Sequence, residues 1–159
     1  MNVELRNLET SDFKPIVSVV NDWWGGREVA GLLQMLFFKH FKSTSFVAEI
    51  DGEMVGFLVG FLSQDFENEA YIHFVGVHPD FRKDGIARTL YEKFFETVKS
   101  EDRNIVRCLT SPINKTSIAF HQRMGFVIET QELEIDGVPV AKDHDGRGQD
   151  RVLFVKKLD

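Results

Sequence analysis

The segment Val75-Gly-Val-His-Pro-Asp-Phe-Arg-Lys-Asp-Gly-Ile-Ala87 carries the strongest structural signal in this sequence. Its first residues are apolar and β-branched, which favours a strand, and Pro79 then ends that strand. From Gly85 to Lys99 the apolar residues recur at four-residue spacing, as on one face of an amphipathic helix. The segment therefore predicts a strand, a short turn and a helix in direct succession.

The turn before this helix has the properties of an anion-binding site. The first amide groups of a helix have no acceptor within the helix, and the helix dipole is positive there. Gly85 and Ala87 are small enough for a phosphate to approach the main chain, and Arg82 and Lys83 add positive charge. These features predict a diphosphate site. The alternative is a turn whose glycine merely begins a helix.

The remaining segments predict one α/β domain over residues 1–159, with a mixed sheet and helices on its faces. Asp51-Gly52 is a hairpin signal between two of the strands. A polar loop is expected from Asp136 to Gly148. The expected strands are Val3–Asn7, Ser45–Ile50, Glu53–Ser63, Ala70–Val77, Ile105–Thr110, Phe126–Ile135 and Asp150–Lys157. The expected helices are Asp12–Asn21, Glu28–Phe41, Gly85–Lys99 and Pro112–Gly125.

Two motifs in this order resemble the GNAT superfamily of N-acetyltransferases. The first is the string Val-x-Val-x-Pro-x-x-Arg-x-x-Gly-x-Ala over residues 75–87, which is similar to the family's Arg/Gln-x-x-Gly-x-Gly/Ala signature. The second, Asn114-x-x-Ser-x-x-Phe-His-x-x-Met-Gly-Phe126, is similar to the family's Asn-x-x-Ala-x-x-Leu-Tyr-x-x-x-Gly-Phe. The predicted order of elements also matches the family along nearly the whole chain.

This resemblance implies a GNAT fold, in which a mostly antiparallel twisted sheet is splayed at its central strands. It implies acetyl-CoA as the cofactor, with its pantetheine arm paired to the main chain of the splayed strand. The residues that the resemblance implies around the cofactor are Val75, Val77, Arg82, Lys83, Gly85, Ile86, Ala87, Asn114 and Ser117.

For catalysis, the resemblance implies that the amide of Val77 stabilises the thioester oxygen, where negative charge develops. His121 occupies the position of the family's usual general acid, a tyrosine, so it is either the proton donor to the departing sulfur or a packing residue. Tyr71, His73, Val75 and Val77 are expected to share one face of their strand, because side chains alternate along a strand.

Three residues are candidates for binding the acceptor amine. Asp22 ends the first helix and would hold a cation, Trp24 would grip the acceptor through its ring, and His73 would relay a proton through water. Each has a structural alternative: helix termination for Asp22, a hydrophobic plug for Trp24, and a hydrogen-bonded core residue for His73. The loop from Asp136 to Gly148 is either a lid over the acceptor or a surface hairpin. No residue is singled out as the general base.

Composition narrows the classes of partner. The net charge is −6, which disfavours nucleic acid. No apolar run is long enough to span a bilayer, and the amino terminus lacks the features of a secretion signal. The single cysteine, Cys108, excludes an intrachain disulfide, so a cytoplasmic protein is expected. The resemblance leaves a homodimer as an option, because many relatives form one.

The expected function is transfer of an acetyl group from acetyl-CoA to a primary amine of a small molecule or peptide, by direct attack in a ternary complex. The alternative is a non-catalytic acyl-CoA-binding regulatory module with the same fold. Release of free thiol distinguishes the two. A nucleoside triphosphate site is disfavoured, because Gly85 is followed by Ile86 and Ala87 rather than by Lys-Ser/Thr.

Overall fold

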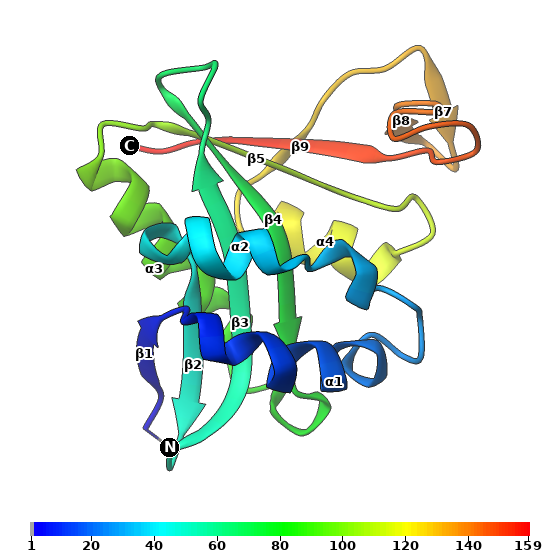
Figure 1. Ribbon diagram of the computed structural model, residues 1–159. Helices are drawn as coiled ribbons and strands as arrows, with labels where there is room; N and C mark the ends of the chain where they lie inside the picture. The colour runs from blue at the N-terminus through cyan, green and yellow to red at the C-terminus, as the bar shows by residue number, and fades with distance from the viewer. Residues whose placement is uncertain (1) are drawn as a thin grey trace.

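The computed structural model describes residues 2–159. Seven strands form one sheet in the order β1-β2-β3-β4-β5-β9-β6, and β7 and β8 form a separate hairpin (Figure 1). The strands are β1 Glu4–Asn7, β2 Phe46–Ile50, β3 Glu53–Leu62, β4 Glu69–Val77, β5 Ile105–Thr110, β6 Val127–Ile128, β7 Leu133–Ile135, β8 Val138–Val140 and β9 Val152–Lys157. The α-helices are α1 Phe13–Trp23, α2 Met35–His40, α3 Ile86–Ser100 and α4 Lys115–Arg123. Short 3-10 helices are η1 Thr10–Asp12, η2 Ala30–Leu32, η3 Lys42–Thr44 and η4 Pro79–Phe81.

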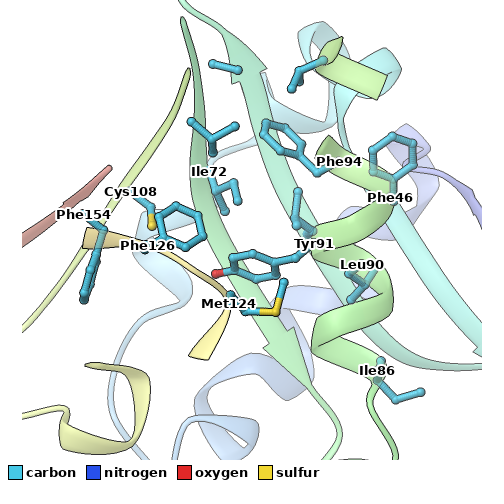
Figure 2. Close-up of a cluster of buried hydrophobic side chains, with 14 of the residues drawn as sticks. Phe46, Ile72, Ile86, Leu90, Tyr91, Phe94, Cys108, Met124, Phe126 and Phe154 are labelled. Carbon is cyan, nitrogen blue, oxygen red and sulfur yellow. The ribbon is translucent and has the colours of Figure 1, made fainter. Parts of the chain in front are cut away.

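Helices cover both faces of the seven-stranded sheet, and each face has its own apolar core. On one face, α1 and α2 bury Ile16, Val20 and Phe38 against the sheet. On the other face, α3 and α4 pack over a second core, part of which Figure 2 shows. The expected mixed α/β architecture is confirmed. Within residues 2–159, none of the helices has the length and apolar character needed to cross a membrane.

Helix α3 lies close to β3 because glycines line the strand beneath it. A Cβ atom on Gly56 would lie 2.8 Å from Cγ2 of Ile86, and one on Gly60 would collide with the ring of Phe94. Neither glycine leaves room for a side chain. This close packing fixes α3, and therefore the turn that precedes it, relative to the centre of the sheet.

The sheet opens between β4 and β5, which form its only parallel pair among the described strands. Their pairing is confined to Glu69–Tyr71 against Ile105–Arg107, and beyond it the two strands diverge (Figure 1). Arg107 reinforces the paired end, because its guanidinium lies 2.8 Å from Glu69 and 2.7 Å from Glu129. The expected splaying of the central strands is therefore present.

The expectation that Tyr71, His73, Val75 and Val77 share one face of the strand is wrong. The register between β3 and β4 shifts because Val59 pairs with Phe74 while Gly60 pairs with Ile72, which leaves His73 as an extra residue. Such a β-bulge interrupts the alternation of side chains. Tyr71 and His73 consequently stack on Phe61 and Phe37 on the α2 side, whereas Val75 and Val77 pack on the α3 side.

Two other expectations are corrected. The helix expected over Glu28–Phe41 is reduced to η2 and α2, because the side chain of Asn21 accepts the amides of Val29 and Ala30 and tertiary contacts hold this segment. The strand expected over Phe126–Ile135 divides into β6, which joins the main sheet, and β7, which turns at Asp136-Gly137 to pair with β8. The expected Asp136–Gly148 loop therefore begins as a hairpin.

Candidate active site

A cleft of about 600 Å³ passes through the opening between β4 and β5. Its walls come from both faces of the sheet, since α1 and the following loop contribute on one side and α3 and α4 on the other. The lining residues are Trp23, Trp24, Gly25, Arg27, Ile72, His73, Phe74, Val75, Val77, Arg82, Ala87, Tyr91, Cys108, Leu109, Thr110, Asn114, Thr116, Ser117, Phe120, His121 and Arg123.

The main chain of β4 presents hydrogen-bonding groups to this cleft. The amide of His78 donates to the carbonyl of Val55 on β3, at 2.8 Å. Because main-chain groups alternate in direction along a strand, those of Val75 and Val77 face the other way, where β5 has diverged. One of them already has a partner, since the indole N–H of Trp24 donates to the carbonyl of Val75 at 3.1 Å. The amide of Val77 is thus directed toward the opening.

The amino terminus of α3 closes one end of the cleft. Gly85 precedes the helix with a left-handed φ of 75°, and no side chain caps the helix there. Helix α4 differs, because the side chain of Asn114 accepts the amide of Ser117 and caps it. The first-turn amides of α3 are therefore the ones left for an anion.

Of the residues expected around the diphosphate, some line the cleft, some are exposed beside it, and one has a buried side chain. Arg82 and Ala87 line the cleft. Lys83 and Gly85 are exposed beside it, and the side chain of Ile86 is buried in the core under α3. From Ile86, only the main chain is available to a ligand.

The charge of the cleft is opposite to that of the whole protein. Arg27, Arg82 and Arg123 line it, while no Asp or Glu appears among the described residues of its wall. The protein as a whole has a net charge of −6. This local concentration of positive charge favours anionic groups in the cleft.

His121 lies in the wall with both ring nitrogens engaged. Its Nδ1 is 2.8 Å from the carbonyl of Ser117, which can only accept, so Nδ1 carries the proton. In the neutral ring Nε2 then accepts, and the hydroxyl of Tyr91 donates to it at 2.8 Å. Burial lowers the pKa of His121, although the Ser117 carbonyl partly opposes this, so the ring is neutral at pH 7.

Tyr91, on α3, keeps the His121 ring in this orientation through their hydrogen bond. Its ring packs edge-on against Phe120 and Phe126, and only 3% of the residue is exposed. Figure 2 shows the hydroxyl directed away from α3, toward the side on which Cys108 and Phe126 lie. Burial raises the pKa of Tyr91, so the hydroxyl keeps its proton.

Of the three residues expected to bind the acceptor amine, Trp24 and His73 line the cleft and Asp22 does not. Trp24 lines the cleft and is bound to β4 as described above. His73 also lines it, but its Nε2 is 2.7 Å from the carbonyl of Leu32 and its ring stacks on Phe37. Asp22 is exposed on α1 and is not part of the wall. Within the described chain, no residue beyond Arg123 lines the cleft, so the Asp136–Gly148 segment lies outside it.

Sequence reasoning did not identify Tyr91, Arg27 or Arg123 as residues of the cleft. Tyr91 falls beside the apolar stripe of α3, so its position predicts a core residue, and its contact with His121 joins two helices that are distant in sequence. Cys108 also lines the cleft, where it is buried, and burial raises the pKa of its thiol.

Residues 4–126 match the Acetyltransferase (GNAT) family, and the chain belongs to that family. It is 39% identical over 85 residues, 51% of this chain, to an N-acetyltransferase of Methanocaldococcus jannaschii. It is 31% identical over 108 residues, 65% of this chain, to the L-2,4-diaminobutyric acid acetyltransferase of Nocardia farcinica. These matches span 38% and 56% of the length of the two relatives, respectively.

A solved structure of similar fold is the diaminobutyrate acetyltransferase of Paenibacillus lautus, in complex with L-2,4-diaminobutyric acid and coenzyme A. The TM-score is 0.74 at 21% identity, and the similarity covers 98% of this chain and 95% of the other. At 21% identity, this similarity is evidence that the two chains share a fold and is not evidence for a shared substrate.

Proposed function

We propose that this protein transfers an acetyl group from acetyl-CoA to a primary amine, by direct attack of the amine in a ternary complex. The observation that carries the proposal is the cleft between β4 and β5, which opens to both faces of the sheet. Two substrates entering from opposite faces would meet beside Val75 and Val77. Alignment of this kind supplies much of the rate of a two-substrate reaction.

The cofactor is proposed to lie along β4 with its diphosphate at α3. The pantetheine arm would pair with the main chain of Val75 and Val77, and the amides of Gly85, Ile86 and Ala87 would hold the diphosphate. The uncapped amino terminus of α3 fits this role, as do the positive charges of Arg82 and Lys83. Asn114 and Ser117 would contact the cofactor from α4, where both line the cleft.

Val77 and His121 are proposed to serve the chemical step. The amide of Val77 faces the opening, where it would donate to the thioester carbonyl oxygen as negative charge develops on it. His121 would handle the proton that leaves the amine and reaches the departing sulfur. Neutral His121 is competent to receive a proton before it donates one.

The acceptor is proposed to be a small amine that also carries a carboxylate, such as L-2,4-diaminobutyrate. Arg27 lines the cleft in the loop that follows α1, and the described wall offers no carboxylate to hold a cationic amine. Two observations thus favour an amino acid: this arginine, and the acceptor named for the relative from Nocardia farcinica. Trp24 and His73 would border the acceptor. Asp22 lies outside the wall of the cleft, so it would contact only a larger acceptor.

Release of free thiol from acetyl-CoA tests the proposal. The purified protein is incubated with acetyl-CoA and each member of a panel of amines, including L-2,4-diaminobutyrate, diamines without a carboxylate, and short peptides. Turnover with a carboxylate-bearing amine is expected. Tight binding of acetyl-CoA without thiol release for any member of the panel would instead indicate the non-catalytic acyl-CoA-binding module.

A further inference from the structure

We propose that Tyr91 is a catalytic residue of this site, whose hydroxyl passes protons between the reacting atoms and His121. His121 then acts only through Tyr91, as the group that stores the proton. This inference rests on the proposed acetyl transfer and adds a residue that neither motif contains.

The geometry leaves His121 without a ring nitrogen for the substrates. Its Nδ1–H donates a hydrogen bond to the carbonyl of Ser117, one turn earlier on α4, and its Nε2 accepts a hydrogen bond from the Tyr91 hydroxyl. The ring is further fixed by stacking on Phe154, with centroids 4.6 Å apart. Direct donation from His121 to a sulfur atom would require both the tautomer and the hydrogen bonds to change.

Tyr91 is the hydrogen-bond partner of His121 on the α3 side of the cleft. Both residues belong to the wall of the cleft, and the Tyr91 oxygen can still accept a hydrogen bond after it donates its proton to His121. A hydroxyl that donates on one side and accepts on the other conducts a proton without becoming charged. The donating half of this requirement is met, because the hydrogen bond to His121 is already formed, at 2.8 Å; the accepting half would be supplied by the bound amine.

The proposed proton transfers from the amine to the departing sulfur need no reactant besides the two substrates, Tyr91 and His121. The amine nitrogen forms its bond to the thioester carbon, and its surplus proton moves to the Tyr91 oxygen while the Tyr91 proton moves to Nε2 of His121. The carbon–sulfur bond then breaks, and its electron pair leaves with sulfur. The imidazolium returns its proton to Tyr91 as Tyr91 protonates the thiolate, so both residues end as they began.

The surroundings of His121 suit temporary storage of a proton. Tyr91 from α3 is hydrogen-bonded to it, and Cys108 from β5 lines the same cleft; burial raises the pKa of both, so neither is charged. Phe154 from β9 and Phe126 after α4 contribute only rings. An imidazolium here has no counter-ion among the described contacts, so it gives its proton back readily.

The kinetic test compares Tyr91→Phe, His121→Phe and the double variant. Each single variant is expected to lower kcat roughly 100-fold, with the KM for acetyl-CoA within about twofold of the wild type. The double variant is expected to lose no more than either single one, because residues that act as a unit are non-additive. Tyr71→Phe is the matched control: it removes the same hydroxyl from the chain's other tyrosine, on the opposite face of the sheet, and kcat is expected to stay unchanged.

Tyr91→Phe is also expected to abolish the decline of kcat at acidic pH that protonation of His121 causes in the wild type. A merely structural hydrogen bond would leave this limb of the pH profile in place. Wild-type kcat in Tyr91→Phe, or losses that multiply in the double variant, would overturn the relay while leaving acetyl transfer intact.

A second measurement does not depend on turnover. Nitrogen-15 NMR of the histidines at pH 7 is expected to show His121 neutral, with the proton on Nδ1 and Nε2 unprotonated. A proton on Nε2 would overturn the relay. If the wild type releases no thiol with any amine, the proposed function fails, and the relay fails with it even where the tautomer is the expected one.

Discussion

At the scale of single residues, His121 couples the protonation of the site to the stability of the fold. Burial lowers its pKa in the folded protein below the usual 6.5, so the unfolded chain binds more protons between these two values. Stability therefore falls as the pH drops through 6.5 toward the folded-state pKa. We expect urea unfolding at pH 8, 7, 6 and 5 to show this loss in the wild type, and a clearly smaller loss in His121→Phe.

Asp12 does not contribute to the loss of stability expected between pH 8 and 5, because its carboxyl titrates at lower pH. Burial alone would raise the pKa of its carboxyl, but the hydrogen bonds from Arg6 and from the amide of Glu9 lower it below 3.8. Its stabilising effect is therefore complete above about pH 4 and is lost at more acidic pH. Parallel pH curves for the wild type and His121→Phe between pH 8 and 5 would show that His121 is not the group responsible.

Arg27 is expected to determine which acceptors bind. If it holds a carboxylate, Arg27→Gln should raise the KM for L-2,4-diaminobutyrate roughly tenfold, because a charged hydrogen bond at this exposed position is replaced by a neutral one. The matched substrate is 1,3-diaminopropane, the same diamine without the carboxylate, whose KM should stay the same. An equal rise for both amines would mean that Arg27 shapes the cleft without recognising the carboxylate.

At the scale of elements, the start of α3 is the feature on which the proposed cofactor binding depends. Gly85→Glu would place a carboxylate beside the amides proposed to hold the diphosphate, and we expect the affinity for acetyl-CoA to fall at least 100-fold. Calorimetric titration measures this directly.

The control for Gly85→Glu is Gly137→Glu. Gly137 also has a positive φ, 79°, and also has open space at its Cβ, but it lies in the β7–β8 turn away from the cleft. Both variants carry a similar cost of a left-handed backbone, roughly 1–2 kcal/mol. If both bind acetyl-CoA normally and remain folded, the diphosphate is held elsewhere.

The elements that the sequence predicted well are those whose signals are local. The stripe of Ile86, Leu90, Phe94 and Val98 predicted α3 to within a residue, and Asp51-Gly52 predicted the β2–β3 hairpin. The errors arose where distant contacts decide the conformation. The bulge at His73 depends on the register with β3, and the wall position of Tyr91 depends on its contact with α4. The undivided strand expected over Phe126–Ile135 is an error of another kind, because its correction was available locally. Asp136-Gly137 is typical of a hairpin turn, and β7 turns there to pair with β8.

At the scale of the whole molecule, the cleft separates two parts of the sheet that have few direct bonds. One part contains β1–β4 with α1 to α3, and the other contains β5, β9 and β6 with α4. They are joined by the short β4–β5 pairing, by the ion pair of Arg107 with Glu69, and by contacts such as that of Tyr91 with His121. A ligand in the cleft would bond to both parts, from β4 and α3 on one side and from α4 on the other.

Acetyl-CoA is therefore expected to stabilise the molecule as a whole and to protect the edges of the opening. At a ligand concentration 100 times the Kd, binding adds about 2.7 kcal/mol to the free energy of unfolding, which for a chain of this size corresponds to a rise in Tm of roughly 5–10 °C. Hydrogen exchange should slow at the amides of Val77 and of the first turn of α3, while the β7–β8 hairpin should exchange at its original rate. In Gly85→Glu, whose affinity is expected to be at least 100-fold lower, the same concentration should add no more than about 0.4 kcal/mol, raise Tm by at most roughly 2 °C, and slow exchange at most about twofold. Protection centred on the hairpin, with none at Val77, would place the cofactor outside the opening between β4 and β5.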